Sequence, residues 1–403
     1  MDKTRFLRSW RWFGPSDAIS LEMIKQTKAE AIVTALHHIP NGTVWRIHEI
    51  EKRNNLLNSH GFSWSVVESL PVHEEIKYRG PNFKKIIANY KKSLVNLGKC
   101  GLTKVCYNFM PVIDWVRTDL NYPWKNHGIS MLFDSPTFVA FDVFILNRPN
   151  AEESYSSELM TKARDVFDKM SEQAKESLAY NIIVVTQGFI DGGVGDANDY
   201  KKAFLAKLEL YKEISRKDLQ NNLAHFLNEI TPFAEENGIT MCLHPDDPPF
   251  HVLGLPRIAG TIKDYQWIMG QNPSPSNGIT FCSGSLSSRA DNDLVTFLKI
   301  HAEKVHFAHL RNTTILDEDG SFCESGHVEG GADMKEIVKI FHEEMLRRKE
   351  LGMENWQIPM RPDHGLKQAD DQNINANPGY PFYGRMKGLE EIAQLENEIS
   401  EIL

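Results

Sequence analysis

The chain lacks any long run of apolar residues and contains little cysteine. No apolar stretch in its 403 residues approaches the roughly 18 residues that suggest a membrane span. Five cysteines, an odd number in a chain of this size, favour free thiols in a reducing cytosol over a disulfide framework. The first residues, MDKTRFLRSWRWFG, contain no apolar segment and no cleavage site typical of secretion. We therefore expect a cytoplasmic protein that does not bind membranes.

An excess of basic charge is also missing. The sequence has 45 lysines and arginines against 54 aspartates and glutamates, which gives a net charge of −9. No basic stripe offsets this charge, and nucleic acid is therefore not an expected partner. The apolar fraction of 41% and the charged fraction of 25% are typical of globular proteins.

What the sequence does contain is an alternation of short strand-like runs with helical patterns. This order favours a parallel sheet covered by helices. The predicted strands are 9–14, 30–36, 62–69, 103–109, 238–246, 278–285, 304–311 and 355–363. The predicted helices are 20–28, 43–58, 83–98, 217–237, 261–270, 291–301, 333–349 and 387–402. Eight strands, each followed by a helix, predict an α/β fold of the TIM-barrel type, (β/α)8.

The chain is longer than such a barrel needs. About 250 residues are typical of this fold, and the surplus lies mainly in residues 112–215. We expect a single barrel domain over 1–403 with a helical insertion over about 112–215, after the fourth strand. Residues 165–185 read as one long helix within it. The insertion is compatible with a lid or with an oligomer contact. The polar loop 370–381 is expected on the catalytic rim.

Metal-ligating residues stand at the ends of four successive predicted strands. In barrel enzymes the chemistry gathers at the carboxyl ends of the strands. The fifth to eighth strands end near His244, Cys282, His309 and Asp363, respectively. Neighbouring strand ends lie about 4.8 Å apart, so these four side chains could surround one cation. Mixed nitrogen, sulfur and oxygen ligands favour a borderline divalent transition metal.

Each of these residues alone has a simpler interpretation. A single histidine at a strand end is more often a hydrogen-bonded structural residue, and a single cysteine is more often a small buried side chain. The concurrence of four on consecutive strands favours the metal site. Cys242 lies on the same face as His244 but deeper, and we expect it to line the core. His306 falls on the opposite face from His309 and is expected to pack against a helix.

Further candidates flank the predicted metal site. His364 directly follows Asp363 and is better placed as an acid or base than as a ligand. Tyr380, in the rim loop, is a second candidate for proton transfer. Arg311 could bind a substrate carboxylate with its planar fork, although a structural ion pair is an equal alternative. The remaining candidate substrate-binding residues are Ser283 and Asn312.

The motifs at these strand ends resemble the mannonate dehydratase family, one of the xylose-isomerase-like barrels. The resemblance covers nearly the whole chain and is weakest in 112–215. It rests on LHPDDPP (243–249), FCSGS (281–285), HFAHLRN (306–312), RPDHG (361–365), PGYPFYGR (378–385), WRWFGPSD (10–17) and ALHHIPNGTVW (35–45).

The resemblance implies a hydro-lyase that converts D-mannonate to 2-keto-3-deoxy-D-gluconate in hexuronate breakdown. It implies Mn²⁺ or Fe²⁺ as the cofactor and the same four metal ligands that the strand ends predict. His364 and Tyr380 match the family's catalytic histidine and tyrosine, which would share removal of the C2 proton and protonation of the departing C3 hydroxyl. The residues alone do not assign acid and base between them.

Two alternatives remain open at this level. One is a metal-dependent sugar isomerase or epimerase on the same barrel, although such barrels usually hold their metals with several Glu and Asp side chains. The other is a non-catalytic, sugar-acid-binding metalloprotein. A homo-oligomer, dimer or higher, is expected as the commonest kind of assembly.

Overall fold

Eight parallel strands close into a barrel in the computed structural model, which describes residues 4–125, 128–187 and 198–401. The order around the barrel is β1-β12-β9-β8-β7-β4-β3-β2. The strands are β1 (Leu7–Arg11), β2 (Ala31–Thr34), β3 (Ser63–Glu68), β4 (Lys104–Tyr107), β7 (Thr240–Leu243), β8 (Asn277–Cys282), β9 (Val305–His309) and β12 (Pro359–Arg361). Each overlaps a predicted strand, and the predicted (β/α)8 barrel is confirmed.

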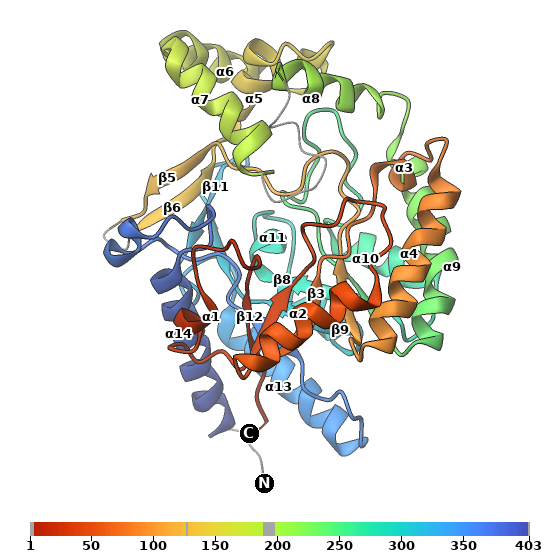
Figure 1. Cartoon of the computed structure of the whole chain (residues 1–403). Coiled ribbons are helices and arrows are strands. Elements are labelled where there is room, and N and C mark those ends of the chain that lie inside the picture. The colour runs from red at the N-terminus through yellow and green to blue at the C-terminus, as the bar shows by residue number, and fades with distance from the viewer. Residues whose placement is uncertain (1–3, 126–127, 188–197, 402–403) are drawn as a thin grey trace.

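The helices of the barrel mostly surround its outer face, and one of them, α11 (Ser283–Ser287), lies at its mouth (Figure 1). They are α1 (Leu21–Ile24), α2 (Ile47–Ser59), α3 (Glu74–Lys77), α4 (Phe83–Lys99), α9 (Arg216–Glu236), α10 (Ile262–Gln271), α11 (Ser283–Ser287), α12 (Leu294–His301), α13 (Met334–Glu350) and α14 (Phe382–Ser400), with 3-10 turns η4 (Ala302–Lys304) and η5 (Ala369–Asn373). α1 is much shorter than the predicted 20–28, and α14 begins five residues before 387; residue 402 lies outside the described part. Reciprocal capping boxes start α9 at Ser215 and α10 at Thr261. None of the described helices is both long and apolar enough to cross a membrane.

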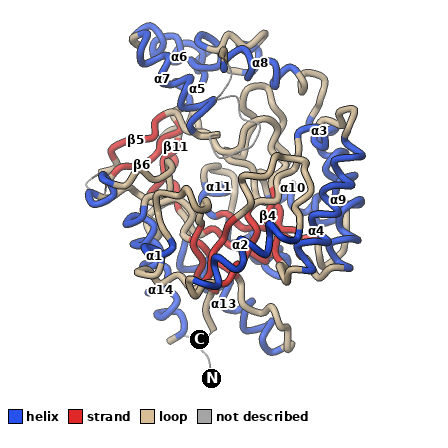
Figure 2. The backbone as a smooth tube through the Cα atoms, viewed as in Figure 1, coloured by secondary structure: helices blue, strands red, loops and turns tan. Residues whose placement is uncertain are grey.

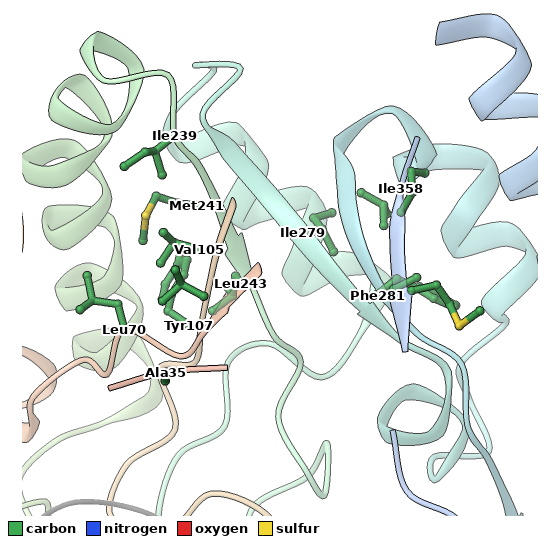
Figure 3. Packing of buried hydrophobic residues seen from close by; sticks show 14 of the residues in the cluster. Ala35, Leu70, Val105, Tyr107, Ile239, Met241, Leu243, Ile279, Phe281 and Ile358 are labelled. Atoms are coloured by element: carbon green, nitrogen blue, oxygen red, sulfur yellow. The ribbon is translucent and has the colours of Figure 1, made fainter. Parts of the chain in front are cut away.

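The main hydrophobic core fills the layer between strands and helices. Figure 3 shows part of it, including Val105, Met241 and Leu243, which alternate with inward-facing residues along β4 and β7. A smaller apolar cluster that includes Cys106 and Phe307 lies inside the barrel. Because strand side chains alternate between the two faces, the same alternation directs the residues at the strand ends into the mouth of the barrel.

His306 does not pack against a helix as the alternation predicted. A register shift between β8 and β9, between Ile279 and Thr280, changes the alternation at the start of β9. The His306 ring lies beside Gly278, where an added Cβ would meet both the His306 Cδ2 and the Thr240 Cγ2 at 2.8 Å. The ring therefore faces the barrel interior.

The segment between β4 and β7 is the insertion that follows the fourth barrel strand. It contains β5 (Asp119–Pro123), β6 (Ile129–Phe133), α5 (Ser135–Ala140), η1 (Phe141–Ile145), η2 (Ala151–Ser154), α6 (Ser157–Lys169), α7 (Glu172–Tyr180), η3 (Asn181–Val185) and α8 (Tyr200–Glu209). Residues 188–197 of the predicted insertion lie outside the described part. In Figure 1 its helices lie together at one end of the molecule, away from α13 and α14. A helical insertion is thus present, and it also carries two strands that were not predicted.

The single helix predicted over 165–185 is wrong. Met170 has an extended backbone (φ −75°, ψ 134°) and ends α6. The Ser171 Oγ then accepts a hydrogen bond from the Ala174 N–H at 3.2 Å and starts α7. Serine is a strong helix N-cap, and this local signal breaks a continuous helical pattern into two helices.

A second, antiparallel sheet joins the insertion to the barrel. Its order is β10-β11-β6-β5, with β10 (Asn312–Ile315) and β11 (Phe322–Ser325) following β9 in the chain. Phe322 pairs with Phe133 of β6, and their rings stack at 5.4 Å. Figure 2 shows these strands as a group apart from the barrel strands. This sheet was not predicted, and it places β11 beside the mouth of the barrel.

Candidate active site

The four predicted metal ligands meet above the ends of neighbouring strands β7, β8, β9 and β12. The ligand atoms of His244, Cys282 and His309 all lie within 4.8 Å of one another. The Asp363 Oδ2 lies 3.7 Å from the Cys282 Sγ and 3.8 Å from the His309 Nδ1. The structure therefore brings the four residues together, as their positions at strand ends predicted.

Each histidine turns one ring nitrogen to the cluster and the other to an oxygen. The His244 Nδ1 lies 2.7 Å from the Pro245 carbonyl oxygen, which leaves Nε2 facing the His309 Nδ1 at 3.1 Å. The His309 Nε2 accepts from the Arg361 Nε at 3.1 Å and lies 3.4 Å from a carboxylate oxygen of Glu68. Metal-bound histidines commonly donate their second N–H to a carbonyl or carboxylate oxygen, and His244 has this arrangement. Two nitrogens bound to one ion at about 2.1 Å are separated by roughly 3.0–3.4 Å, which fits the observed distance.

The thiol of Cys282 is held by two donors from one residue. The Ser285 N–H donates to the Sγ at 3.5 Å and the Ser285 hydroxyl donates at 3.1 Å. Both donors converge on the sulfur, the atom through which cysteine binds metal ions. Ser285 lies in α11, directly after β8, so the turn from strand to helix positions both donors.

Asp363 is fixed by its backbone and by two arginines. Its φ of 58° lies in the left-handed region, which is uncommon for a residue other than glycine. Arg311 donates from Nε at 2.7 Å and Arg361 donates from Nη1. Against the cost of burial, the charges of Arg361 and the neighbouring cationic groups hold the pKa of Asp363 well below its usual range. The carboxylate is thus ionised and aimed at the cluster.

His364 points one ring nitrogen at a buried carboxylate. Its Nδ1 lies 3.1 Å from an Oε1 of Glu324, on β11. Glu324 also accepts from Arg311 at 2.7 and 2.9 Å and from Arg117 at 2.7 Å. Although burial opposes it, the charges of Arg311 and Arg117 lower the pKa of Glu324 to about 2. An ionised Glu324 accepts the Nδ1–H of His364 and leaves its Nε2 as a proton acceptor.

Tyr380 lies against His364 at the rim. Their rings meet edge to face with centroids 5.1 Å apart, and the Tyr380 side chain is buried. Burial raises the pKa of Tyr380, and the phenol is therefore protonated near neutral pH. The two candidates for proton transfer thus form a contacting pair beside Asp363.

His244, Asp363, His364 and Tyr380 line one cavity of about 160 Å³. This is roughly ten times the space that one water needs, so the cavity can hold a small solute. Groups from both the barrel and the insertion contribute to its wall. Besides His244, Asp363, His364 and Tyr380, the polar lining includes Arg11, His37, Glu68, Asn108, Asp114, Gln187 and Lys207.

The three predicted substrate-binding residues are bonded within the protein. Ser283 donates to the carbonyl oxygens of His309 and Arg311, and Asn312 donates to those of His327 and Ala332. Neither residue lines the cavity. Ser283 begins α11 directly after β8, and Asn312 begins β10 of the second sheet, so each side chain bonds backbone groups around it.

Arg311 reaches the cavity, but its donors contact carboxylates of the protein. They bind Asp363, Glu324 and Asp247, the last at 2.5 Å. The geometry therefore corresponds to the alternative of a structural ion pair, and it makes Arg311 a positioning residue for Asp363.

Several site residues were missed from the sequence. Glu68 ends β3 and bonds the Arg361 guanidinium at 2.8 and 2.7 Å. The rule that predicted the metal ligands, which looks for functional side chains at the carboxyl ends of strands, could also have identified Glu68. Glu324 carried no comparable signal because its place depends on the second sheet.

The fold and the site together define a (β/α)8-barrel enzyme with a candidate metal centre at the carboxyl ends of its strands. The family model described as D-mannonate dehydratase (UxuA) matches residues 6–403. The chain is 43% identical over 385 residues to a mannonate dehydratase of Saccharophagus degradans, covering 95% of each chain. It is 44% identical over 395 residues to one of Chromohalobacter salexigens, covering 98% of this chain and 99% of that one.

A solved structure agrees with these sequence matches. The mannonate dehydratase of Streptococcus suis serotype 2 is 30% identical, with a TM-score of 0.75, over 99% of this chain and 95% of that one. This chain belongs to the D-mannonate dehydratase family, and the resemblance noted in the motifs is confirmed.

Proposed function

We propose that this protein is a hydro-lyase that dehydrates D-mannonate to 2-keto-3-deoxy-D-gluconate with Mn²⁺ or Fe²⁺ as its cofactor. The observation that carries the proposal is the meeting of two groups at one cavity, which His244 and Asp363 of the first group line together with both residues of the second. A cluster of four metal-ligating residues (His244, Cys282, His309 and Asp363) lies directly beside the contacting pair His364 and Tyr380.

The ligand set suits a divalent transition metal. Two imidazoles, a thiolate and a carboxylate combine nitrogen, sulfur and oxygen donors, which suit such ions better than calcium or magnesium. When bound, the ion supplies Lewis-acid stabilisation of the charge that develops on the substrate carboxylate. The charged groups around it are otherwise balanced, since four arginines face four carboxylates: Arg11, Arg117, Arg311 and Arg361 with Glu68, Asp247, Glu324 and Asp363.

The protein's own groups move two protons in this scheme. His364 takes the proton from C2 through its Nε2, because Glu324 holds the opposite nitrogen in the donor form. Tyr380 donates its phenolic proton to the departing C3 hydroxyl, since burial keeps the phenol protonated. Loss of water leaves an enol, which becomes the 2-keto product. The two protons therefore travel through adjacent side chains.

The wider setting follows from the same proposal. Degradation of hexuronates is the expected pathway, because D-mannonate is a reduced hexuronate. The five free cysteines support a reducing cytoplasm as the location. Trp115 and Gln187 of the insertion line the cavity, which supports a lid role for this segment. We expect a symmetric homo-oligomer.

A keto-acid assay with metal-stripped protein tests the proposal. D-Mannonate is offered to the stripped protein alone and again after addition of Mn²⁺ or Fe²⁺, and 2-keto-3-deoxygluconate is measured. We expect product only when metal is present. Parallel incubations with aldoses and ketoses test the isomerase alternative. Folded, metal-loaded protein that forms no keto acid would contradict the dehydratase assignment, and formation of an isomer would replace it.

A further inference from the structure

One buried arginine in the cavity lacks a full set of acceptors. Arg11, at the end of β1, is only 6% exposed. Its Nη1 donates to the Glu68 carbonyl oxygen and its Nη2 lies 3.3 Å from the His37 Nε2. The buried Nε–H has no hydrogen-bond partner among the residues that the structure describes. Leaving a buried donor unpaired is costly, and buried donors of this kind call for a partner that the protein does not itself provide.

His37 completes a set of hydrogen-bond donors beside Arg11. Burial, followed by the charges of Arg11 and Arg53, lowers the pKa of His37 to about 3, and the ring is therefore neutral near pH 7. Because an arginine can only donate, the His37 Nε2 accepts from Arg11, and the ring proton stands on Nδ1. Both residues line the same cavity as His244 and Asp363.

The two residues lie across the mouth from two of the four proposed metal ligands, His244 and Cys282. In the closed order of eight strands, β1 is four places from β7, and β2 is four places from β8. Arg11 therefore stands opposite His244, and His37, which follows β2, stands opposite Cys282. A linear sugar acid whose carboxyl end is bound at the ligands extends its other end across the mouth toward this pair.

We propose that Arg11 and His37 form the subsite for the hydroxyl groups at the end of the sugar acid remote from its carboxylate, and that this pair sets the preference for a six-carbon acid. The inference rests on the proposed dehydratase function and deepens it. Hydroxyls fit better than a second carboxylate because the Arg11 charge is already matched by Glu68, 3.4 Å away. Binding energy from this remote end is then used to orient the reacting C2 and C3 atoms.

The test compares two substrates in the metal-loaded enzyme. One is D-mannonate, and the other is the four-carbon acid with the same configuration at C2 and C3, which cannot reach the subsite. In Arg11→Met, kcat/KM for D-mannonate should fall about 10- to 100-fold, as expected for lost hydrogen bonds to a charged group. For the four-carbon acid it should fall less than about threefold. Metal content and circular dichroism are measured for each variant.

Two further variants keep the test decisive. His37→Leu should show the same selective loss of kcat/KM for D-mannonate. It replaces Arg11→Met in the test if that variant does not fold. Arg53→Met is the matched control, since Arg53 is also buried but bonds Thr34 and Ala35 and does not line the cavity. Any fall in kcat/KM in this control should be equal for D-mannonate and the four-carbon acid.

The outcomes separate the two levels of the proposal. The subsite alone would be overturned if the wild type is active and the Arg11 and His37 variants lose kcat/KM equally for both substrates. The same holds if these variants keep kcat/KM for both. A wild type that prefers the six-carbon diacid to D-mannonate would also overturn it, because a carboxylate would then be the favoured group. A metal-loaded wild type that does not act on D-mannonate would overturn the dehydratase function and the subsite with it.

Discussion

At the scale of single residues, His364 illustrates how two neighbouring side chains take different tasks. Asp363 faces the metal cluster, whereas the His364 ring turns to Glu324 and Tyr380. We expect His364→Ala to lower kcat about 10²- to 10⁴-fold, the usual contribution of a general base, with unchanged metal content. Metal analysis by mass spectrometry together with the keto-acid assay checks this. Loss of the metal from this variant would make His364 a ligand and contradict the proposed role.

The buried carboxylate of Glu324 predicts a dependence of stability on pH. Its pKa is about 2 in the folded protein and 4.5 in the unfolded chain, so the unfolded state binds more protons between these values. Its contribution, of the order of 3 kcal/mol, is fully present above about pH 4.5 and is lost as the pH falls toward 2. Urea unfolding at a series of pH values should show this fall in the free energy of unfolding.

Variants of Glu324 separate its contribution from general acid unfolding. Glu324→Gln should flatten the pH dependence and lower the stability at pH 7, since it leaves Arg311 and Arg117 without a buried counter-charge. Glu329→Gln, at an exposed position, is the control and should keep the wild-type profile. A profile for Glu324→Gln that matches the wild type would refute this account.

Much of the candidate site was predictable at this scale, for a physical reason. Strand alternation and the gathering of barrel sites at strand ends are local rules, and they located His244, Cys282, His309 and Asp363. Arg311 shows the limit of local rules. Its place in the sequence suits a substrate carboxylate, but three carboxylates from distant parts of the chain occupy its donors.

At the scale of elements, the contact between β6 and β11 holds the insertion against the barrel. Phe133 is buried there and packs on Phe322, Phe138 and Phe250. Phe133→Ala should cost about 3–5 kcal/mol of unfolding free energy and reduce kcat, because β11 carries Glu324. Urea denaturation and the keto-acid assay measure the two effects.

A truncation at an exposed apolar position is the control for this change. Leu316→Ala, at a side chain that is 40% exposed, should change stability by less than about 0.5 kcal/mol. If Phe133→Ala loses stability while keeping full kcat, then the second sheet does not position His364, the proposed catalytic histidine.

This sheet also shows which part of the fold the sequence does not reveal. Its strands are only four or five residues long, and the hydrogen bond from Ser130 to the carbonyl oxygen of Glu324 joins residues 194 positions apart. Pairing at that distance leaves no local pattern. The barrel strands, by contrast, recur with helices between them, and that recurrence is visible in the chain.

At the scale of the whole molecule, the proposed metal ligands lie at the ends of four of the eight barrel strands. A bound ion therefore stabilises only the folded chain. At a free concentration 100 times its Kd, Mn²⁺ should add about 2.7 kcal/mol to the free energy of unfolding, seen as a rise in Tm by calorimetry. Cys282→Ser should lose most of this rise, whereas Cys100→Ser, at a half-buried thiol on the barrel exterior, should keep it. An undiminished rise in Cys282→Ser would exclude Cys282 as a ligand.

The shared sheet has a consequence for exchanging parts between members of the family. The insertion ends in the chain well before β11, yet β6 pairs with β11 and the Phe133 ring stacks on Phe322. Consider a chimera that takes residues 112–215 from a relative and keeps residues 322–325 of this chain. Its second sheet would pair a β6 and a β11 that come from different proteins and did not evolve together. The transferable unit is therefore discontinuous, and a donor's segment should be moved together with the donor's β11.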